Sequence, residues 1–313
     1  MEIPILVVFD IDETLIQFIN NSAHHYFDEI SIEDRKIIQD SEIEYLDKKT
    51  RNNKDTAFVS DCILFRPYLR KFLNIVKENP RIHIALWTYA EQEYAEAIAQ
   101  IITKHFGFKK NPFVFTFGAE NMEQEDYPKS LNEIWDKEEF KKYNKFNSII
   151  VDDRLGNVSH ENNLYNGIAC QGFAPFHETK ARAPLTKESL SASINDTMFL
   201  DLIKIIENSF TYIDGCSKKE CRDAFSEESI FSPKIIKKNG NIKYVQDVKK
   251  IKIKDGVETE NSYTMVAIGD VSLAGSQHKG GSIKKNIKKK SRKTRKPQKK
   301  YNNKNNKTRY TKK

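Results

Sequence analysis

The sequence predicts an α/β protein built on a Rossmann-like parallel sheet with helices on both faces. Three observations predict this fold. Short apolar runs alternate with amphipathic stretches over residues 1–214, an order that favours parallel strands joined by crossover helices. The first run, at residues 3–9, is almost continuously apolar and β-branched, which is typical of a strand buried on both faces. Three runs end at a polar residue, namely Asp10, Thr88 and Asp152.

The elements follow from these runs in order along the chain. We expect strands, where apolar residues dominate, at residues 3–9, 81–88, 113–117, 147–153 and 167–171. We expect helices, where apolar residues recur at helical spacing, at residues 65–80, 91–107, 131–143 and 195–210. Pro67 suits the first turn of the first helix, and Gly107 closes the second. Residues 18–57 are polar and mixed, which indicates an insertion with a helix-like stretch at 31–46.

The chain is expected to divide into three parts. Residues 1–214 carry the α/β pattern and form the main domain. Residues 215–278 are expected to be a small β-rich appendage of unknown role, in which Asn239-Gly240 would be the turn of a hairpin. Residues 279–313 contain 14 Lys, 3 Arg and no acidic residue, and they are almost free of apolar residues. They are therefore expected to be a disordered basic tail.

The charge is divided between an acidic body and this tail. The whole chain of 313 residues carries a net charge of +8, but residues 1–278 hold 35 basic and 44 acidic residues and so carry −9. A tail of this kind binds nucleic acid or other polyanions without sequence preference, or it only keeps the protein in solution. Both interpretations stay open from the sequence.

The sequence disfavours several classes of protein. No run of 18 or more apolar residues is present, so no membrane contact is expected. The apolar run at residues 5–9 is too short for a signal peptide. The four cysteines are scattered without a C-x-x-C pair, which suits a reducing compartment. We therefore expect an intracellular protein, nuclear or cytoplasmic, that is not secreted.

Asp10 and Asp12 stand together at the end of the first expected strand. Two close carboxylates do not both ionise easily, so the pKa of one rises while the other stays charged. The charged group can act as a nucleophile or a metal ligand. The protonated group can give a proton to a leaving group and later take one from water. Outside such a setting, an Asp-x-Asp pair is more often a solvated turn.

Other strand ends and one loop supply groups that suit phosphoryl chemistry. Asp152 and Asp153 would converge on the first pair, and several carboxylates in one crevice need a hard cation, for which Mg²⁺ is the natural choice. Thr88 offers a hydroxyl and Lys129 a positive charge to a phosphoryl group. Taken singly, Thr88 also fits a helix N-cap and Lys129 a surface lysine. Together these side chains suit phosphoryl transfer through an aspartyl-phosphate.

The segment DIDET, at residues 10–14, resembles the D-x-D-x-T signature of the haloacid dehalogenase superfamily. The order of the later candidates, over residues 3–214, is similar to the remaining motifs of that superfamily. The segments FRPYLRKFL, LWTYAEQEYAEAI and IIVDDR are similar to those of one branch, the TFIIF-associated and small CTD phosphatases. This branch dephosphorylates the C-terminal domain of RNA polymerase II.

The resemblance implies roles for the residues of the first motif. Asp10 would be the nucleophile and a magnesium ligand. Asp12 would be the acid/base and would offer its backbone carbonyl to the metal. Thr14 would hold the shape of the loop.

The resemblance also implies roles for the later motifs. Thr88 and Lys129 would bind the phosphoryl oxygens, and Asp152 and Asp153 would complete the metal site. Two departures from the branch are visible. Arg154-Leu155 stands where the branch usually has Ser-Pro, and the segment around the lysine carries several insertions.

Three functions are compatible with these residues. The first is a Mg²⁺-dependent phosphatase of phosphoserine or phosphothreonine in a protein, with the polymerase C-terminal domain as one candidate substrate. The second is a nucleic-acid end phosphatase of the same superfamily, which the basic tail at 279–313 would suit. The third is a non-catalytic module that binds phosphoproteins or polyanions. The retention of Asp10, Asp12 and Asp152 argues against the third.

Overall fold

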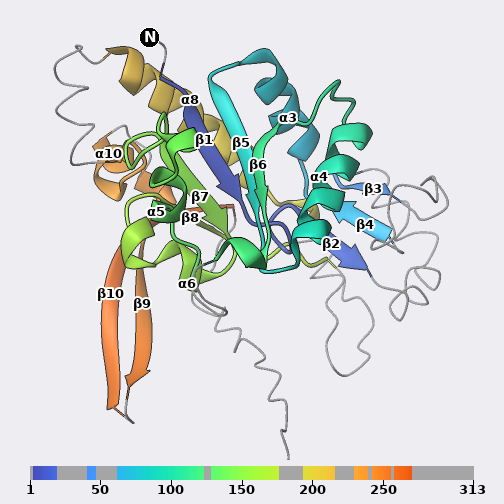
Figure 1. Cartoon of the computed structure of the whole chain (residues 1–313). Helices are drawn as coiled ribbons and strands as arrows, with labels where there is room; N and C mark the ends of the chain where they lie inside the picture. Colours follow the sequence, from blue (N-terminus) through green and yellow to red (C-terminus); the bar gives the residue numbers. More distant parts are fainter. Residues whose placement is uncertain are drawn as a thin grey trace, which may run out of the picture. The chain divides into compact units, whose positions relative to one another are not determined.

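A seven-stranded sheet forms the centre of the protein (Figure 1). The computed structural model describes residues 3–19, 41–46, 62–122, 128–175, 193–215, 229–238, 242–254 and 257–269. The expected basic tail at 279–313 lies outside these ranges.

All strands of this sheet except β9 run in the same direction. In spatial order they are β6 (Phe113–Phe117), β5 (Ile82–Trp87), β1 (Ile5–Phe9), β7 (Ser148–Asp152), β8 (Gly167–Cys170), β10 (Val257–Ile268) and β9 (Val245–Lys254). The predicted α/β fold with a parallel sheet is therefore confirmed.

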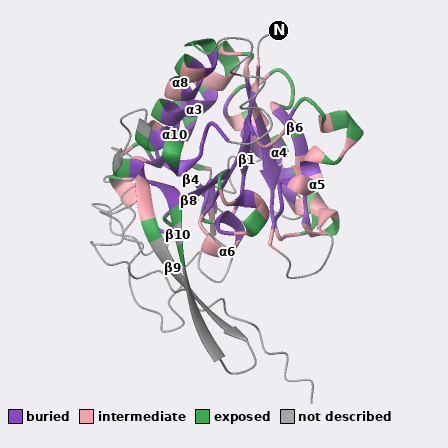
Figure 2. Ribbon diagram, turned by 90° about the vertical axis from the view of Figure 1, so that its left-hand side faces the viewer, coloured by how far each residue is buried: buried purple, intermediate pink, exposed green. Residues whose placement is uncertain are grey.

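Helices cover both faces of the sheet because its central strands are apolar on both sides. On β1, Ile5, Val7 and Phe9 pack into one core layer, while Leu6 and Val8 pack into the other. The first layer holds α3 (Leu69–Glu78), α4 (Gln92–His105) and α8 (Met198–Gly215). The second holds α5 (Asn132–Trp135) and the 3-10 turn Glu138–Phe140. Figure 2 shows the buried residues gathered in the sheet and on the inner sides of the helices.

Two predicted helices differ from those observed. α3 begins at Leu69, because Tyr68 adopts a left-handed backbone conformation (φ 62°) that turns the chain just before the helix. Pro67 therefore precedes the helix instead of opening its first turn. The helix predicted over 131–143 is interrupted, since Lys137 has an extended backbone between α5 and the following 3-10 turn.

A second, three-stranded sheet is built from parts of the expected insertion. It contains β2 (Ile16–Ile19), β4 (Cys62–Phe65) and β3 (Glu44–Leu46), with antiparallel pairing throughout. The helix-like prediction for 31–46 is wrong at its end, where Glu44–Leu46 pairs as a strand with β4; residues 20–40 lie outside the described residues. Glu44 also accepts hydrogen bonds from Arg70 and lies 2.9 Å from His105 Nε2, so the small sheet is joined to α3 and α4.

The described part of residues 215–278 extends the main sheet instead of standing apart from it. β10 pairs in parallel with β8, and β9 forms the antiparallel edge. The inner end of β10 is apolar from Met265 to Ile268 and is fully buried. α10 (Pro233–Lys238) and the 3-10 turn Ile242–Tyr244 precede these strands. The expected separate appendage is therefore wrong for these strands, because the pairing of β10 with the free edge of β8 joins segments that are far apart in the sequence.

The predicted hairpin in this segment is also corrected. The residues before Asn239-Gly240 form α10 and not a strand, and the two turn residues themselves lie outside the described residues. The hairpin lies later in the chain, where β9 and β10 pair from Lys254 and Val257 onward.

Asp201 on α8 holds the C-terminal segment against the helix. Its carboxylate accepts hydrogen bonds from the Tyr244 hydroxyl at 2.8 Å and from the Gly269 backbone N–H at 3.2 Å. Thr197 Oγ1 donates to the same carboxylate at 3.1 Å. Burying a carboxylate costs little free energy when several donors hydrogen-bond to it. Because two of these donors lie next to β9 and β10, their bonds to Asp201 hold the C-terminal strands against α8.

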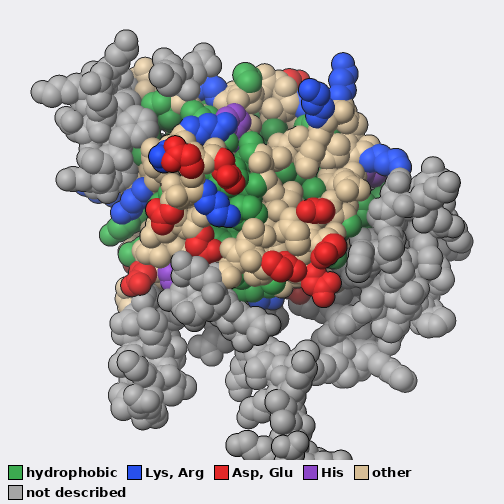
Figure 3. Space-filling view, in the orientation of Figure 1, with side chains coloured by type: hydrophobic (Ala, Val, Ile, Leu, Met, Phe, Trp, Pro, Cys, Tyr) green, Lys and Arg blue, Asp and Glu red, His purple; other side chains and the backbone are tan. Residues whose placement is uncertain are grey.

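The surface of the described residues mixes both signs of charge. Figure 3 shows acidic and basic side chains interspersed on one face, with several acidic side chains close together at its lower right. Among the described residues, no helix is long and apolar enough to cross a membrane.

Candidate active site

The carboxyl ends of the parallel strands meet where the predicted polar residues stand. β1 lies between β5 and β7, and Phe9 pairs in register with Leu86 and Val151. Asp10 and Asp152 therefore follow at the same level on neighbouring strands. The chain runs from β1 to β5 and β6 on one side and then returns to β7 on the other. Such a reversal of strand order is where α/β sheets open a ligand crevice.

The loop after β1 folds tightly on itself. The backbone N–H groups of Leu15 and Ile16 both donate to the carbonyl of Ile11, at 2.9 and 3.2 Å. Glu13 adopts a positive φ of 60°, a conformation that a residue with a β-carbon keeps only where its surroundings hold it. The loop therefore needs external contacts to keep its shape.

A buried arginine, Arg66, supplies several of these contacts. Its guanidinium donates to the carbonyl of Thr14 at 2.9 Å and to the carbonyl of Gln171 at 2.6 Å. It also forms an ion pair with Asp196 at 2.7 Å. Because the side chain is enclosed, these partners replace the water that the charge has lost. Arg66 thus joins the loop after β1 to the segment that follows β8 and to the start of α8.

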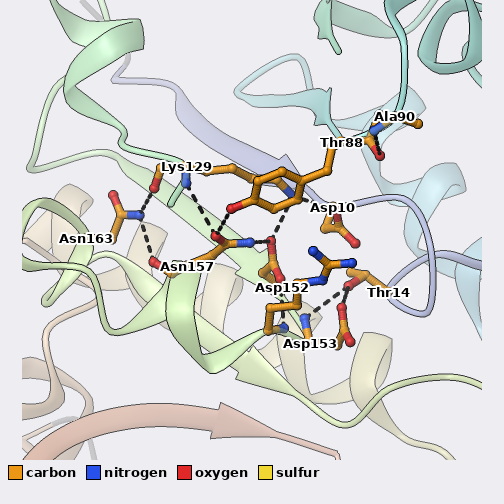
Figure 4. A network of polar contacts seen from close by, with 11 residues as sticks. Asp10, Thr14, Thr88, Ala90, Lys129, Asp152, Asp153, Asn157 and Asn163 are labelled. Carbon is orange, nitrogen blue, oxygen red and sulfur yellow. Dashed lines mark hydrogen bonds and ion pairs between the residues drawn. The ribbon is translucent and has the colours of Figure 1, made fainter. Parts of the chain in front are cut away.

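Lys129 lies buried between two of the predicted carboxylates (Figure 4). Its Nζ contacts Oδ1 of Asp10 and donates to Oδ2 of Asp152 at 2.8 Å. The lysine side chain is 0% exposed, so its interpretation as a surface lysine is wrong. A fixed positive charge therefore stands between the ends of β1 and β7.

Two asparagines that the sequence analysis did not single out hold this arrangement in place. Asn157 Nδ2 donates to Oδ2 of Asp152 at 2.7 Å, and its Oδ1 accepts from the Tyr89 hydroxyl at 2.6 Å. Asn163 Nδ2 donates to the backbone carbonyls of Lys129 and Asn157, at 2.5 and 2.9 Å. Both asparagines are buried. They sit in a polar stretch with no periodic pattern, so nothing in the sequence marked them.

Asp10, Asp152 and Asp153 form a cluster of acidic side chains. One ligand atom from each lies within 4.8 Å of the others. Thr14 holds Asp153, since its Oγ1 donates to Oδ1 of Asp153 at 3.3 Å and accepts from the Asp153 backbone N–H at 3.2 Å. Oδ1 of Asp152 accepts from the Arg154 backbone N–H at 2.8 Å. We call this group the carboxylate cluster.

Burial is the largest influence on the pKa values of Asp10, Asp153 and Lys129. It raises the pKa of Asp10 well above its usual value, against the attraction of Lys129. Burial also raises the pKa of Asp153 to about 7, and repulsion by Asp152 adds to this. For Lys129, burial alone lowers the pKa, but the two neighbouring carboxylates outweigh it, so the net pKa lies above its usual value. Lys129 therefore stays charged at neutral pH.

Asp12 is held from α4. The hydroxyl of Tyr94 donates to Oδ1 of Asp12 at 2.6 Å. Burial is the largest influence on Asp12 and raises its pKa, while the hydrogen bond from Tyr94 lowers it. Tyr94 lies within the segment LWTYAEQEYAEAI, but its residue type alone does not mark it as part of the site.

Thr88 follows β5 and is buried, with 2% exposed surface. Its Oγ1 accepts from the backbone N–H of Ala90 at 3.2 Å, so the hydroxyl is used locally at the approach to α4. Figure 4 places it on the far side of Asp10 from Asp153. Its own O–H proton is donated to no described residue.

The predicted residues therefore lie near the carboxyl ends of β1, β5 and β7 but differ in how they are joined. Those linked by hydrogen bonds or ion pairs into the carboxylate cluster and its supports are Asp10, Thr14, Lys129, Asp152 and Asp153. Asp12 is joined to Tyr94, and Thr88 to the backbone beyond it.

A buried lysine among carboxylates at the carboxyl ends of a parallel sheet is an arrangement that suits a phosphatase-like α/β protein. The family model described as NLI interacting factor-like phosphatase matches residues 5–197, which is more than half of the chain. The chain belongs to this phosphatase family, and the resemblance to the CTD-phosphatase branch of the superfamily is confirmed.

Several solved structures are similar to the chain. Fcp1, an essential RNA polymerase II CTD phosphatase, is 16% identical with a TM-score of 0.38, and the match covers 60% of this chain and 48% of that one. A variant of the fission yeast RNA polymerase II CTD phosphatase Fcp1, bound to beryllium fluoride, is 15% identical with a TM-score of 0.44 and coverages of 76% and 67%.

A haloacid dehalogenase-like hydrolase from Bacteroides fragilis is 12% identical with a TM-score of 0.35, and the match covers 61% of this chain and 93% of that one. The chain spans about half the length of the first Fcp1 structure, with 48% covered. No curated protein sequence matches the chain.

Proposed function

We propose that this protein is a Mg²⁺-dependent phosphatase that removes phosphate from phosphoserine or phosphothreonine in proteins through an aspartyl-phosphate at Asp10. The observation that carries the proposal is the contact of buried Lys129 with Asp10 and Asp152 beside Asp153. This fixed positive charge lies among acidic groups where the strand order of the sheet reverses, which suits a site for an anionic group and a metal. The match to a phosphatase family supports this chemistry.

The donors of the carboxylate cluster fit Mg²⁺. All three are carboxylate oxygens, which hard cations prefer, and they converge within 4.8 Å. No described residue donates a hydrogen bond to Oδ2 of Asp10 or to Oδ2 of Asp153, so these atoms are available as ligands. When bound, Mg²⁺ would offset the repulsion between the acids and a phosphate group.

The proposed reaction has two steps. In the first, a carboxylate oxygen of Asp10 attacks phosphorus and forms a new O–P bond. The bond between phosphorus and the serine or threonine oxygen breaks, and Asp12 gives its proton to that oxygen. In the second, Asp12 takes a proton from water as the water oxygen attacks phosphorus. The bond to Asp10 then breaks and phosphate is released.

The raised pKa of Asp12 suits this role. Burial raises its pKa most strongly, which helps it to carry a proton into the first step. Tyr94 fixes the direction of the carboxyl group through its hydrogen bond of 2.6 Å. A proton donor must lie within hydrogen-bond reach of the leaving oxygen, so this restraint favours transfer.

Lys129 and Thr88 are suited to hold the phosphoryl oxygens. The lysine ammonium has three donors, and its contacts with Asp10 and Asp152 use two of them. The third remains for a phosphoryl oxygen. The Thr88 hydroxyl proton is likewise not donated to any described residue. Both side chains are buried, so water competes weakly for these donors.

Activity of the purified full chain on three substrates tests the proposal. The substrates are p-nitrophenyl phosphate, a phosphoserine peptide of the polymerase C-terminal domain and a 3′-phosphorylated oligonucleotide, each with excess Mg²⁺ or excess EDTA. We expect Mg²⁺-dependent hydrolysis of the first two. The polymerase peptide is chosen because FRPYLRKFL and IIVDDR resemble the branch that acts on it.

Asp10→Asn should lower kcat by roughly 10⁴–10⁶-fold, since it removes the nucleophile with little change in volume. Asp136→Asn is the matched control, because Asp136 is exposed and lies outside the crevice. Preferred hydrolysis of the oligonucleotide would favour the nucleic-acid end phosphatase instead. Full activity in EDTA would contradict the metal, and Asp10→Asn activity within tenfold of wild type would contradict the aspartyl-phosphate.

A further inference from the structure

We propose that Arg154 recognises a second anionic group of the substrate, a carboxylate or a phosphate, on a residue near the phosphoserine or phosphothreonine. This inference rests on the proposed function and adds which substrates the site selects. Arg154 directly follows Asp152 and Asp153 and precedes α6 (Leu155–Val158). None of the proposed chemical steps uses it.

Arg154 adjoins the carboxylate cluster. Its backbone N–H donates to Oδ1 of Asp152 at 2.8 Å, which fixes the point where the side chain begins. The residue is exposed, whereas Lys129 is buried.

A tyrosine ring orients the guanidinium. Cζ of Arg154 lies 4.9 Å from the centroid of the Tyr89 ring. Tyr89 follows Thr88 in the chain, and its hydroxyl donates to Oδ1 of buried Asn157 at 2.6 Å, so the ring is held at both ends. A guanidinium packed on an aromatic ring keeps its N–H groups free for hydrogen bonding.

The same ring also contacts the buried lysine. Nζ of Lys129 lies 5.2 Å from the Tyr89 centroid. The two distances together limit the separation of Lys129 Nζ and Arg154 Cζ to at most 10.1 Å. An extended peptide advances about 3.3–3.6 Å per residue. A phosphate at Lys129 and an anion at Arg154 would therefore come from residues at most about three positions apart.

The guanidinium is unpaired in the described part of the chain. No hydrogen bond or ion pair joins it to a described residue, and it packs on the Tyr89 ring. By contrast, Arg66, Arg70 and Arg81 each pair with a carboxylate. Five N–H donors in a fixed plane match a carboxylate or phosphate through two parallel hydrogen bonds. The chemistry of Arg154 thus suits an oxyanion brought by the substrate.

A simpler interpretation is that Arg154 only offsets the charge of the acids beside it. In that case its loss would change the turnover of all substrates by the same factor. Recognition of a second anion instead predicts that the loss depends on the neighbour of the phosphorylated residue. The ratio between substrates therefore separates the two interpretations, whatever happens to the overall rate.

The test uses one phosphoserine peptide whose neighbouring residue is varied. Glutamine, glutamate, lysine or a second phosphoserine is placed one to three positions away, on either side. Values of kcat/KM are measured for wild type, Arg154→Gln and Arg154→Glu. Lys109→Gln serves as the charge-matched control, because Lys109 is exposed between α4 and β6, at the sheet edge opposite the crevice.

Wild type should prefer an acidic neighbour over glutamine by about tenfold, the lower range for a hydrogen bond to a charged group at an exposed site. Arg154→Gln should remove the preference, Arg154→Glu should reverse it in favour of lysine, and Lys109→Gln should keep it. The preference should also shrink with salt. Equal preference for glutamate and phosphoserine would indicate any oxyanion, and preference for phosphoserine alone would indicate a phosphate.

An unchanged ratio in Arg154→Gln would overturn the inference. The same peptides are also given a fluorescent label, and their binding to the Asp10→Asn protein is measured by fluorescence anisotropy. This measurement separates failure of the role of Arg154 from failure of the proposed function. A binding preference that disappears with Arg154→Gln, without turnover in wild type, would keep the inference and refute the phosphatase. Turnover of all peptides with no preference would keep the phosphatase and refute the role of Arg154.

Discussion

Lys129→Met tests the carboxylate cluster most directly. Methionine keeps an unbranched apolar side chain of similar length but removes Nζ, so Asp10 and Asp152 lose their shared positive charge. Lys129 and Asp152 are both 0% exposed, so water cannot take the place of the ammonium group. Breaking a buried ion pair by removing one partner costs about 3–5 kcal/mol. We expect a loss of this size in the free energy of unfolding at neutral pH.

The loss should grow as the pH rises. The raised pKa of Lys129 gives the wild type stability that is complete below the unfolded pKa, near 10.4, so this contribution is constant in the acid and neutral range. In the variant, the pKa of Asp10 rises further, because burial raises it and the attraction of Lys129 is gone. The folded variant then binds more protons than the unfolded chain, and its stability falls as pH rises above about 4.

Urea unfolding in EDTA, near pH 5 and pH 7, measures both effects. Lys109→Met is the control, since exposed Lys109 should change stability by less than about 0.5 kcal/mol. The double variant Lys129→Met/Asp10→Asn should recover part of the lost free energy of unfolding, because one of the two acids left without a positive partner is replaced by a neutral side chain. A cost below about 1 kcal/mol at pH 7, or an equal cost at both pH values, would refute the reasoning.

Three further predictions concern the surroundings of the site. Tyr94→Phe should lower kcat by roughly tenfold and move the basic limb of the pH profile upward, because the lost hydrogen bond otherwise lowers the pKa of Asp12; an unaltered profile would contradict this. Arg66→Met should reduce the free energy of unfolding by about 3–5 kcal/mol, because Asp196 and several carbonyl groups lose their partner. Denaturant titration measures this loss. Truncation after residue 277 should leave turnover of a small phosphomonoester unchanged. It should also abolish a nucleic-acid affinity that, in the full chain, falls about 10³–10⁵-fold between 50 and 200 mM salt; equally tight binding without the tail would show that it is no tether.

Much of the main sheet could be predicted from the sequence because its strands are apolar on both faces. Such strands appear as uninterrupted apolar runs, and their polar ends mark where the sheet stops. The predicted strand at 113–117 coincides with β6, and those before Asp10 and Asp152 differ from β1 and β7 only at their ends. Parallel strands align their carboxyl ends, so the meeting of Asp10 and Asp152 followed from the same pattern.

The C-terminal strands show where this reasoning fails. The sequence of β10 mixes polar and apolar residues and gives no sign of its partner strand. Its place in the main sheet depends on pairing with the free edge of β8 and on the hydrogen bond from Gly269, just after β10, to Asp201. The residues of α10 were taken for a strand because a short apolar-basic run fits either structure. Local pattern does not decide which distant partner such a segment finds.

The sequence by itself determined the kinds of groups in the crevice and the strand ends that carry the acids, because residue type and strand alternation are local properties. Only the tertiary structure decided that Lys129 lies buried between Asp10 and Asp152, and that Tyr94, Asn157 and Asn163 support them. These contacts join loops that are far apart along the chain. Their geometry depends on how the two core layers pack against the sheet, and no spacing in the sequence records that packing.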